Sequence, residues 1–152
     1  MYYFAYGSNM SERHMKNEEV PYRSREHAVL NDFKLTFDKK AVNEPGFAYA
    51  DILPQNSSRV EGILYEIEDE GIEILDRVEG FPDHYKRDKI NVITDKGEEK
   101  SAIVYRASED MVDENLKPSG EYLGYMMQGR DLLSKEYTEK LLDYIDTLIK
   151  YE

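Results

Sequence analysis

The sequence predicts a single α+β domain, and three observations lead to this prediction. Segments with apolar residues at alternate positions, typical of strands, are mixed with segments whose apolar residues recur every three or four positions, typical of helices. Their order is strand, helix, several strands, helix, two strands and two helices, which lacks the regular alternation of a doubly wound parallel sheet. The chain also contains no internal repeat and no low-complexity linker, so we expect one domain over residues 1–152.

The chain begins with an aromatic segment, residues 2–6, that we expect to form a short buried strand. Gly7 should end this strand, because glycine adopts backbone angles that are closed to other residues. Asn9, followed three positions later by Glu12, is typical of a capping box and predicts the start of a short helix. The sequence YGSN therefore lies at a turn between a strand and a helix.

The strands of the middle region are predicted from alternation and from turn residues. Phe33, Leu35 and Phe37 alternate with polar residues, as in a half-buried strand. The short stretches EPGF and PQNSSR are interpreted as turns within the fold, and DKGEE as the turn of a hairpin. Strands are expected over residues 27–38, 47–54, 59–67, 88–95 and 100–107.

Three more helices are predicted from a period of three to four residues. In residues 68–80 the side chains of Ile72, Leu75 and Val78 form one apolar stripe, and Gly80 is expected to end the helix in a left-handed conformation. Two helices, over residues 119–133 and 134–152, follow the hairpin, and the second is amphipathic.

Composition excludes several classes of function. With 20 basic and 32 acidic residues the net charge is −12, which repels phosphate, so we expect neither nucleic acid nor an anionic membrane as a partner. The absence of cysteine removes thiol nucleophiles, thiolate metal ligands and disulfides, and suits a reducing compartment. No signal peptide and no membrane-spanning run is evident, so we expect a cytoplasmic protein. His14, His27 and His84 lack metal-ligand spacing, and neither a metal nor a cofactor is expected.

The YGSN turn is the first candidate site. A glycine turn at a helix start presents unpaired backbone amides, here those of Gly7, Ser8, Asn9 and Met10, beside the positive end of the helix dipole. These amides suit a substrate carboxylate or a developing oxyanion. The alternative is that YGSN is an ordinary connection between a strand and a helix. The motif by itself favours this alternative, because short glycine motifs are common.

Glu79 and Tyr122 are the other candidates. Glu79 is expected at the last helical position before Gly80, where the helix dipole is negative, and Val78 and Phe81 offer partial burial. Both effects raise the pKa of a carboxyl group towards the range that suits a general acid or base. The alternative is a solvated glutamate at a helix end. Taken alone, Ser119 is interpreted as the N-cap of a helix, and Tyr122, on the first turn of that helix, as a half-buried core residue.

Taken together, the segments YFAYGSNM, LDRVEGFPDHY and PSGEYLGYMMQG resemble the γ-glutamylcyclotransferase family, whose fold is also called AIG2-like. The resemblance extends to PYRSREHAVLNDFKLTFD, EPGFAYADILP and SSRVEGILYEI, and so covers nearly the whole chain. It implies a small mixed β-barrel with flanking helices and an active-site cavity at the YGSN loop.

The resemblance also implies roles for particular residues. Glu79 is expected to be the catalytic general acid/base, and Met10 stands where many relatives have leucine. The residues expected to bind substrate are Tyr6, Gly7, Ser8, Asn9, Met10 and Tyr122.

The implied reaction is cyclisation of a γ-glutamyl amide to 5-oxoproline with release of an amine or amino acid, without a cofactor. The substrate's own α-amine is the nucleophile, which agrees with the absence of cysteine and of any serine-triad signature. YGSN, rather than the YGT of the γ-glutamylamine branch, favours an amino-acid amide. The basic residues of HYKRDK either face a carboxylate-bearing leaving group or form a solvated basic patch beside a strand.

Other readings of the same site stay open. The substrate can be a γ-glutamylamine or an intermediate protected by a γ-glutamyl group. In a non-catalytic member the same cavity would bind a small anion or a protein partner. The segment YLGYMM leaves a homodimer open as well as a place in the core.

Overall fold

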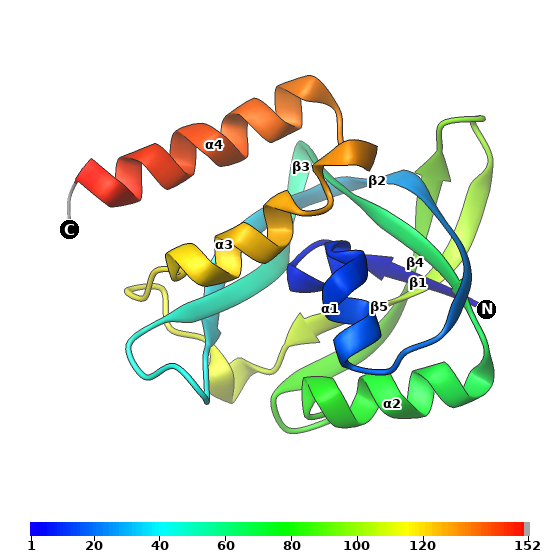
Figure 1. Cartoon of the computed structure of the whole chain (residues 1–152), viewed down its shortest axis with the longest axis horizontal. Helices are drawn as coiled ribbons and strands as arrows, with labels where there is room; N and C mark the ends of the chain where they lie inside the picture. The colour runs from blue at the N-terminus through cyan, green and yellow to red at the C-terminus, as the bar shows by residue number, and fades with distance from the viewer. Residues whose placement is uncertain (151–152) are drawn as a thin grey trace.

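Five strands close into a barrel in the computed structural model, which describes the backbone of residues 1–150 and the side chains of residues 1–147 (Figure 1). The order around the barrel is β1-β3-β2-β4-β5, and the strands pair antiparallel except β1 with β5. The strands are β1 (Tyr2–Ala5), β2 (Tyr22–Lys40), β3 (Ala48–Ile67), β4 (Tyr85–Thr94) and β5 (Glu99–Ala107). The predicted α+β class and the mixed barrel are confirmed.

In the part of the chain that the structure describes, four α-helices and three 3-10 turns surround the barrel. In Figure 1, α2 and α4 lie on opposite sides of it and α1 lies between them. None of the described helices is long and apolar enough to cross a membrane. The α-helices are α1 (Glu12–Asn17), α2 (Asp69–Glu79), α3 (Gly120–Met127) and α4 (Lys135–Lys150), and the 3-10 turns are η1 (Ser8–Met10), η2 (Glu109–Met111) and η3 (Arg130–Leu132).

The two longest strands, β2 and β3, form one hairpin, which corrects a predicted break. PQNSSR does not separate two strands; it is an irregularity inside β3, opposite a register shift between Asn31 and Phe33. Asp32 and Ser57 both have a positive φ there, and the Ser57 amide donates to Asp32 Oδ1 at 3.1 Å. Turn-forming residues thus bulge the sheet without ending it, because the flanking residues continue their cross-strand pairs.

The core lies inside the barrel and beneath the helices. Phe4 of β1 and Tyr65 of β3 are completely buried, and so is Leu75 of α2. Each such side chain contributes about 1.5–3 kcal/mol through its removal from water. Gly62 of β3 is required by close packing, since a Cβ there would lie 2.4 Å from the carbonyl oxygen of Ala5. β1 therefore sits tightly against β3 and fixes where the YGSN turn begins.

The first helix begins later than expected. Its N-cap is Ser11, whose hydroxyl accepts from the His14 amide at 3.1 Å, so the predicted capping box of Asn9 and Glu12 is wrong. The turn η1 separates the strand from the helix and turns the Asn9 side chain inward, where it is 3% exposed. Asn9 thus becomes part of the interior of the site.

The second helix follows the prediction closely. α2 ends at Glu79, and Gly80 stops it with φ 67°, in the left-handed region. Ile72 and Leu75 are buried as predicted, but Val78 is 43% exposed and lies at the cavity wall, not in the core. The predicted N-cap of α3 is confirmed, because the Ser119 hydroxyl accepts from a backbone amide one turn later. The end of the last predicted helix, residues 151–152, lies outside the described residues.

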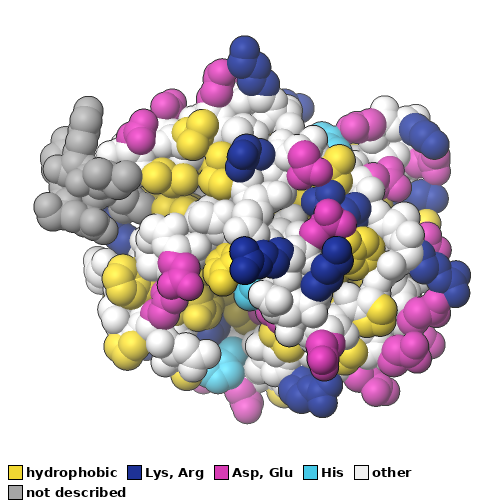
Figure 2. Space-filling model, in the orientation of Figure 1, with side chains coloured by type: hydrophobic (Ala, Val, Ile, Leu, Met, Phe, Trp, Pro, Cys, Tyr) yellow, Lys and Arg dark blue, Asp and Glu magenta, His cyan; other side chains and the backbone are white. Residues whose placement is uncertain are grey.

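Acidic and basic side chains are interspersed on the face shown in Figure 2, so the net charge of −12 does not gather there into one patch. The segment YLGYMM is largely internal, with Leu123 and Met126 buried against the barrel. Most of this segment is therefore part of the core, and the homodimer stays a prediction.

Candidate active site

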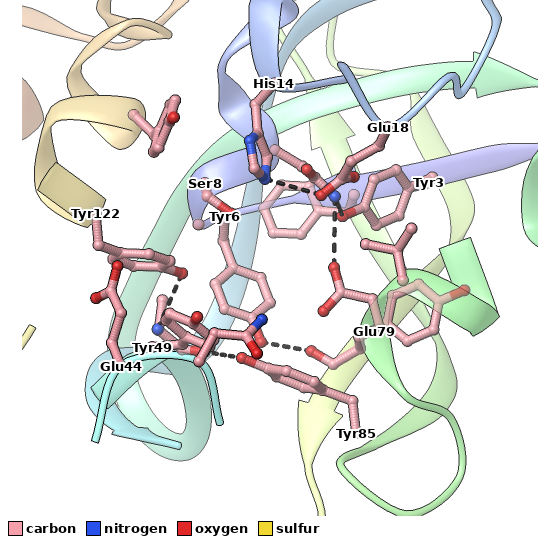
Figure 3. Close-up of a pocket in the computed structure, with 18 residues that line it drawn as sticks. Tyr3, Tyr6, Ser8, His14, Glu18, Glu44, Tyr49, Glu79, Tyr85 and Tyr122 are labelled. Atoms are coloured by element: carbon pink, nitrogen blue, oxygen red, sulfur yellow. Dashed lines mark hydrogen bonds and ion pairs between the residues drawn. The ribbon is translucent and has the colours of Figure 1, made fainter. Parts of the chain in front are cut away.

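A cavity of about 370 Å³ lies where the C-terminal ends of β1, β5 and α2 meet the N-terminal ends of β3, β4 and α3 (Figure 3). The YGSN turn, α1 and the loop between β2 and β3 complete its wall. Of the predicted site residues, Tyr6, Gly7, Ser8, Asn9, Glu79 and Tyr122 all line this cavity. Segments more than 100 positions apart in the sequence are therefore brought to one place.

Met10 is the exception among the predicted site residues. Its side chain is completely buried, it does not line the cavity, and its amide donates to the carbonyl oxygen of Gly7 at 3.0 Å. The expectation of a free amide at Met10 is therefore wrong, because the chain forms a 3-10 turn here. Within the described residues, the amides of Gly7, Ser8 and Asn9 donate to no backbone carbonyl.

Gly7 has φ −116° and ψ −136°, a combination outside the usual helical and extended regions, which agrees with the expectation for a glycine that ends the strand. Gly7 is also needed for space. A Cβ at this position would lie 2.6 Å from the Tyr122 hydroxyl oxygen and 3.3 Å from Ala50 Cβ. The hydroxyl is itself held in place, because it accepts from the Ala50 amide at 3.0 Å. The Tyr122 side chain thus packs against one side of the YGSN turn and fixes the position of the amides of that turn.

Asn9 links the YGSN turn to Glu79. Its Nδ2 atom donates to the Tyr3 hydroxyl at 3.0 Å and to Glu79 Oε1 at 3.4 Å, as the dashed lines of Figure 3 show. Its carbonyl oxygen accepts from the Tyr65 hydroxyl at 2.7 Å. The side chain is therefore oriented by Tyr3 of β1 and Glu79 of α2, while Tyr65 of β3 holds the backbone of Asn9.

Glu79 points into the cavity from the last residue of α2 (Figure 3). Burial, and after it the negative charge of Glu18, raise its pKa to about 8, and the positive charge of Lys39 opposes them. The pKa of Glu79 is raised, as its position at the end of the helix predicts, but the contribution of Glu18 to this shift was not predicted from the sequence. Without a bound cation the group is thus largely protonated at pH 7, and it titrates where a general acid or base operates.

Tyrosines supply much of the wall, and sequence reasoning found only two of them. The Tyr6 hydroxyl donates to the carbonyl oxygen of Tyr105, and the Tyr85 hydroxyl donates to that of Ala50 at 3.1 Å. Burial raises the pKa of Tyr6 and of Tyr85 well above the ordinary value, so both stay neutral. The available signal was compositional, since the chain has 13 tyrosines and no tryptophan.

Two further elements contribute charged groups that no motif indicated. His14 of α1 and Glu18, the residue that caps the end of α1, line one side of the cavity, with His14 Nε2 at 2.8 Å from Glu18 Oε1. Glu44, in the loop between β2 and β3, lines another side near Tyr49 and Tyr122 (Figure 3). Among the described residues no group of three or more histidine, aspartate or glutamate side chains is placed to hold a metal ion.

The basic side chains of HYKRDK do not line the cavity, so the alternative of a basic patch outside the site holds, and not the expectation that they face a leaving group. Arg87 instead pairs with Asp76 and lies over the Phe81 ring at 4.6 Å. Arg87 therefore links α2 to β4.

The model of the family "Gamma-glutamyl cyclotransferase, AIG2-like" matches residues 3–124, a range that includes the YGSN turn, Glu79 and Tyr122. The chain belongs to this family. A putative gamma-glutamylcyclotransferase of Methanocaldococcus jannaschii is 32% identical over 92 residues, which cover 57% of this chain and 75% of the relative.

Solved structures show the same cyclotransferase fold. A gamma-glutamyl cyclotransferase with 24% identity matches with a TM-score of 0.81 over 100% of this chain and 99% of that one. YkqA from Bacillus subtilis, with 26% identity, matches with a TM-score of 0.82 over 96% of this chain and 54% of its own. The family resemblance stated from the sequence is therefore confirmed, and the cavity of this cyclotransferase-like chain is the natural place to look for its activity.

Proposed function

We propose that the chain cyclises a γ-glutamyl amide to 5-oxoproline and releases an amine, with Glu79 as general acid and base. The observation that carries this proposal is the position of Glu79 in the cavity, where its pKa is raised to about 8. Asn9 connects it to the YGSN turn, so an acid/base group and a row of amide donors face the same space. Membership of the cyclotransferase family supports the choice of reaction.

The reaction moves two protons from the attacking to the leaving nitrogen. Glu79 takes one proton from the substrate's α-ammonium group, and the resulting amine attacks the γ-carbonyl carbon to form the lactam C–N bond. The attacking nitrogen then loses a second proton, and Glu79 returns a proton to the leaving nitrogen as the γ-amide bond breaks. The departing amine leaves as an ammonium ion with the second proton, so both protons and charge balance. A group whose pKa lies near the working pH suits both directions of transfer.

The amides of Gly7, Ser8 and Asn9 are the donors available to the substrate. We assign to them the negative charge of the γ-glutamyl group, either its α-carboxylate or the oxyanion that forms on the γ-carbonyl. The Tyr122 hydroxyl packs against Gly7 of this turn and is itself held by its hydrogen bond from the Ala50 amide. Positioning matters because oriented intramolecular reactions reach effective molarities on the order of 10⁵–10⁸ M.

The test is to incubate the purified chain with γ-glutamyl dipeptides, γ-glutamylamines and glutathione, and to quantify 5-oxoproline by mass spectrometry. Glu79→Gln keeps the shape of the side chain but cannot exchange a proton, so turnover should fall roughly 10²–10⁴-fold. Glu73→Gln is the matched control, because Glu73 is exposed on the same helix and does not line the cavity.

The result expected is release of 5-oxoproline that is lost in Glu79→Gln and retained in Glu73→Gln. Full activity in Glu79→Gln would remove this carboxyl group from the mechanism. If the folded protein released no 5-oxoproline from any of these substrates, the result would contradict the proposed reaction. It would favour a non-catalytic cavity that binds a ligand.

A further inference from the structure

A bulge near the end of β2 places a lysine inside the molecule. The pairing of β2 with β3 shifts its register between Phe37 and Lys39, so Asp38 is passed over in the ladder. Two successive residues, Asp38 and Lys39, are therefore both buried, at 4% and 2% exposure, where a regular strand would turn one of them to solvent. The bulge thus brings the ammonium group of Lys39 into the interior.

The buried ammonium group has no carboxylate partner. Among the residues that the structure describes, no aspartate or glutamate forms an ion pair with Lys39. Its Nζ atom donates to the carbonyl oxygen of Lys40 at 2.7 Å and lies 3.4 Å from His84 Nδ1. Neither of these partners brings a negative charge. Burial of a charge without a close counter-charge is unfavourable, so stability alone does not explain a lysine at this position.

Lys39 lies behind the tyrosines of the cavity wall. Its Nζ atom is 5.6 Å from the centre of the Tyr49 ring and 5.2 Å from that of the Tyr85 ring, and such ring faces attract a cation. Both tyrosines line the cavity together with Glu79, whereas Lys39 does not (Figure 3). None of the described wall residues is lysine or arginine, so the positive charge that serves this cavity lies one layer behind it.

The same lysine contacts the loop that follows Glu79. The His84 amide donates to the carbonyl oxygen of Gly80 at 2.8 Å, and a Cβ at Gly80 would lie 2.5 Å from His84 Cδ2. His84 Nδ1 accepts from Lys39 only while this nitrogen carries no proton. Lys39 therefore reaches the residue that packs against the end of α2, where Glu79 lies.

The other groups around Glu79 do not favour its charge. Burial, and after it the charge of Glu18, raise the pKa of Glu79, and His14 is paired with Glu18 at 2.8 Å. Among the described residues, Lys39 is the cation that acts on Glu79 in the opposite direction. Glu79 must be ionised before it accepts a proton, so this cation favours the form that acts as the base. Burial raises the pKa of each nearby tyrosine, so these side chains stay neutral; they are Tyr3, Tyr6, Tyr49, Tyr85, Tyr105 and Tyr122.

We propose that Lys39 is a positioning residue of the cyclisation: its ammonium group, held behind two tyrosine rings, is the counter-charge that stabilises the Glu79 carboxylate, the form that accepts the substrate's proton. This inference rests on the proposed function and adds to it a residue that does not touch the substrate. Lys39 acts through the electric field of the site, which is strong across a wall of low polarity. It gives the bulge in β2 and the buried cation a common purpose.

The pH dependence of kcat/KM separates an effect of charge from a structural one. Lys39→Met replaces the cation by an apolar side chain of similar length, so the acid limb of the profile should move towards alkaline pH by about one unit. Below this limb kcat/KM should fall about tenfold, and on its alkaline side the loss should disappear. Thermal unfolding should show that the variant is folded, since apolar replacement of a buried ion is tolerated.

NMR titration of the Glu79 carboxyl carbon measures the same effect without turnover. The signal is identified by its absence from Glu79→Gln, and its midpoint should rise by about one unit in Lys39→Met. Lys39→Arg keeps the positive charge and should restore both the midpoint and the acid limb.

Two controls accompany these variants. Lys40→Met is the matched control, because Lys40 is the next residue of the strand, is exposed and does not line the cavity. It should behave as the wild type. His84→Phe keeps a ring against Gly80 but removes the titratable neighbour of Lys39, and it should leave the acid limb in place. A shift as large as that of Lys39→Met would show that the loop, and not the charge, carries the effect, and would overturn the inference.

The outcomes separate this inference from the proposed function. With turnover present, an acid limb or a midpoint that stays in place in Lys39→Met, or a loss of kcat/KM that is equal at all pH values, would overturn the inference and leave the cyclisation intact. A midpoint that rises in Lys39→Met, in a protein whose wild type releases no 5-oxoproline, would contradict the proposed reaction and still support Lys39 as the counter-charge of Glu79. An unchanged midpoint without turnover would overturn both.

Discussion

At the scale of single residues, Glu79 occupies a place that disfavours its charge. It ends a helix, where the dipole is negative, it is surrounded by tyrosines, and a second carboxyl group lies nearby. Among the described residues, the opposing charge that acts on it is that of Lys39, whose own pKa is lowered by burial. A group of this kind costs stability when it ionises, so its titration should be visible in the unfolding of the protein.

We therefore predict a pH dependence of stability that comes from Glu79. Its pKa is about 8 in the folded chain against 4.5 as the ordinary value, so between these pH values the folded state binds more protons than the unfolded state. Stability from this group is thus present at low pH and lost as the pH rises from about 4.5 to 8. Thermal unfolding of wild type and Glu79→Gln at several pH values measures this contribution. All other groups titrate in both proteins, so the difference between the two reports Glu79 alone.

The stability of Glu79→Gln relative to the wild type should increase as the pH rises from about 4.5 to 8. Each 1 kcal/mol of difference in the free energy of unfolding shifts Tm by roughly 2–4 °C. Glu73→Gln, exposed on the same helix, should follow the wild type at every pH. Melting temperatures of wild type and Glu79→Gln that run parallel from pH 4.5 to 9 would show that Glu79 has an ordinary pKa, and would weaken its acid/base role.

Sequence alone found the parts of the site that carry local motifs. YGSN, the glutamate before Gly80 and the tyrosine after Ser119 are each marked by a turn or a cap, and together they resemble one family. Glu18 and Glu44 carry no such mark, because a helix surface and a loop tolerate glutamate anywhere. Their proximity to the cavity depends on contacts between distant segments, which neither periodicity nor composition encodes.

At the scale of elements, the site depends on where α2 stops. Gly80 has φ 67°, and a Cβ there would lie 2.5 Å from His84 Cδ2. The His84 amide also donates to the Gly80 carbonyl oxygen at 2.8 Å, so the loop folds back tightly on the helix end. This return loop fixes the last residue of the helix, which is Glu79.

Gly80→Ala should therefore lower both stability and activity. The left-handed conformation costs an alanine about 1–2 kcal/mol, and the clash with His84 adds to this cost. Gly97→Ala is the matched control, since Gly97 has φ 79° but a Cβ there meets nothing within 4 Å. Urea unfolding should show a larger loss at Gly80. A shift of the Glu79 side chain should also lower turnover by about tenfold or more, because small misplacements are costly in catalysis. Equal losses of stability in the two variants, with unchanged turnover, would show that the return loop does not position Glu79.

Element boundaries were harder to predict than element types. PQNSSR has the residues of a turn, but the pairing of β2 with β3 resumes beyond it, and only that distant partner makes it a bulge. In the same way Asn9 and Ser11 are both good caps, and Ser11 becomes the cap because η1 uses the preceding residues. Local propensity proposes several solutions, and tertiary pairing selects one.

At the scale of the whole molecule, the barrel must hold its C-terminal helix. Glu61 of β3 is 3% exposed and accepts from the amide and the hydroxyl of Ser134, which precedes α4, at 2.8 and 2.6 Å. It also pairs with His27 of β2 at 2.8 Å, and His27 in turn pairs with Asp95 at 2.5 Å. This chain of contacts joins the centre of the barrel, the turn between β4 and β5, and the start of α4.

The pKa values of this cluster show how its charges are held. Burial acts against the charge of Glu61, but the hydrogen bonds of Ser134 and the positive charge of His27 bring its pKa below the ordinary value. Burial likewise disfavours the His27 cation, and the carboxylates of Asp95 and Glu61 raise its pKa in spite of this. The stabilisation from His27 is therefore complete below its unfolded pKa of about 6.5 and is lost as the pH rises through its folded value.

Glu61→Gln and Asp95→Asn should consequently differ strongly at pH 6, although each replaces one carboxylate of His27 by an amide. Loss of a partner from a buried pair costs about 3–5 kcal/mol, whereas an exposed pair contributes about 1 kcal/mol or less. The Asp95 side chain is 74% exposed and that of Glu61 is 4% exposed, so Glu61→Gln should show by far the larger drop in the free energy of unfolding in urea. That drop should shrink as the pH rises above about 6.5 and through the folded pKa of His27, where this residue loses its charge in the wild type. Similar losses in the two variants, or a loss that does not change with pH, would mean that α4 is held by its apolar contacts and not by this cluster.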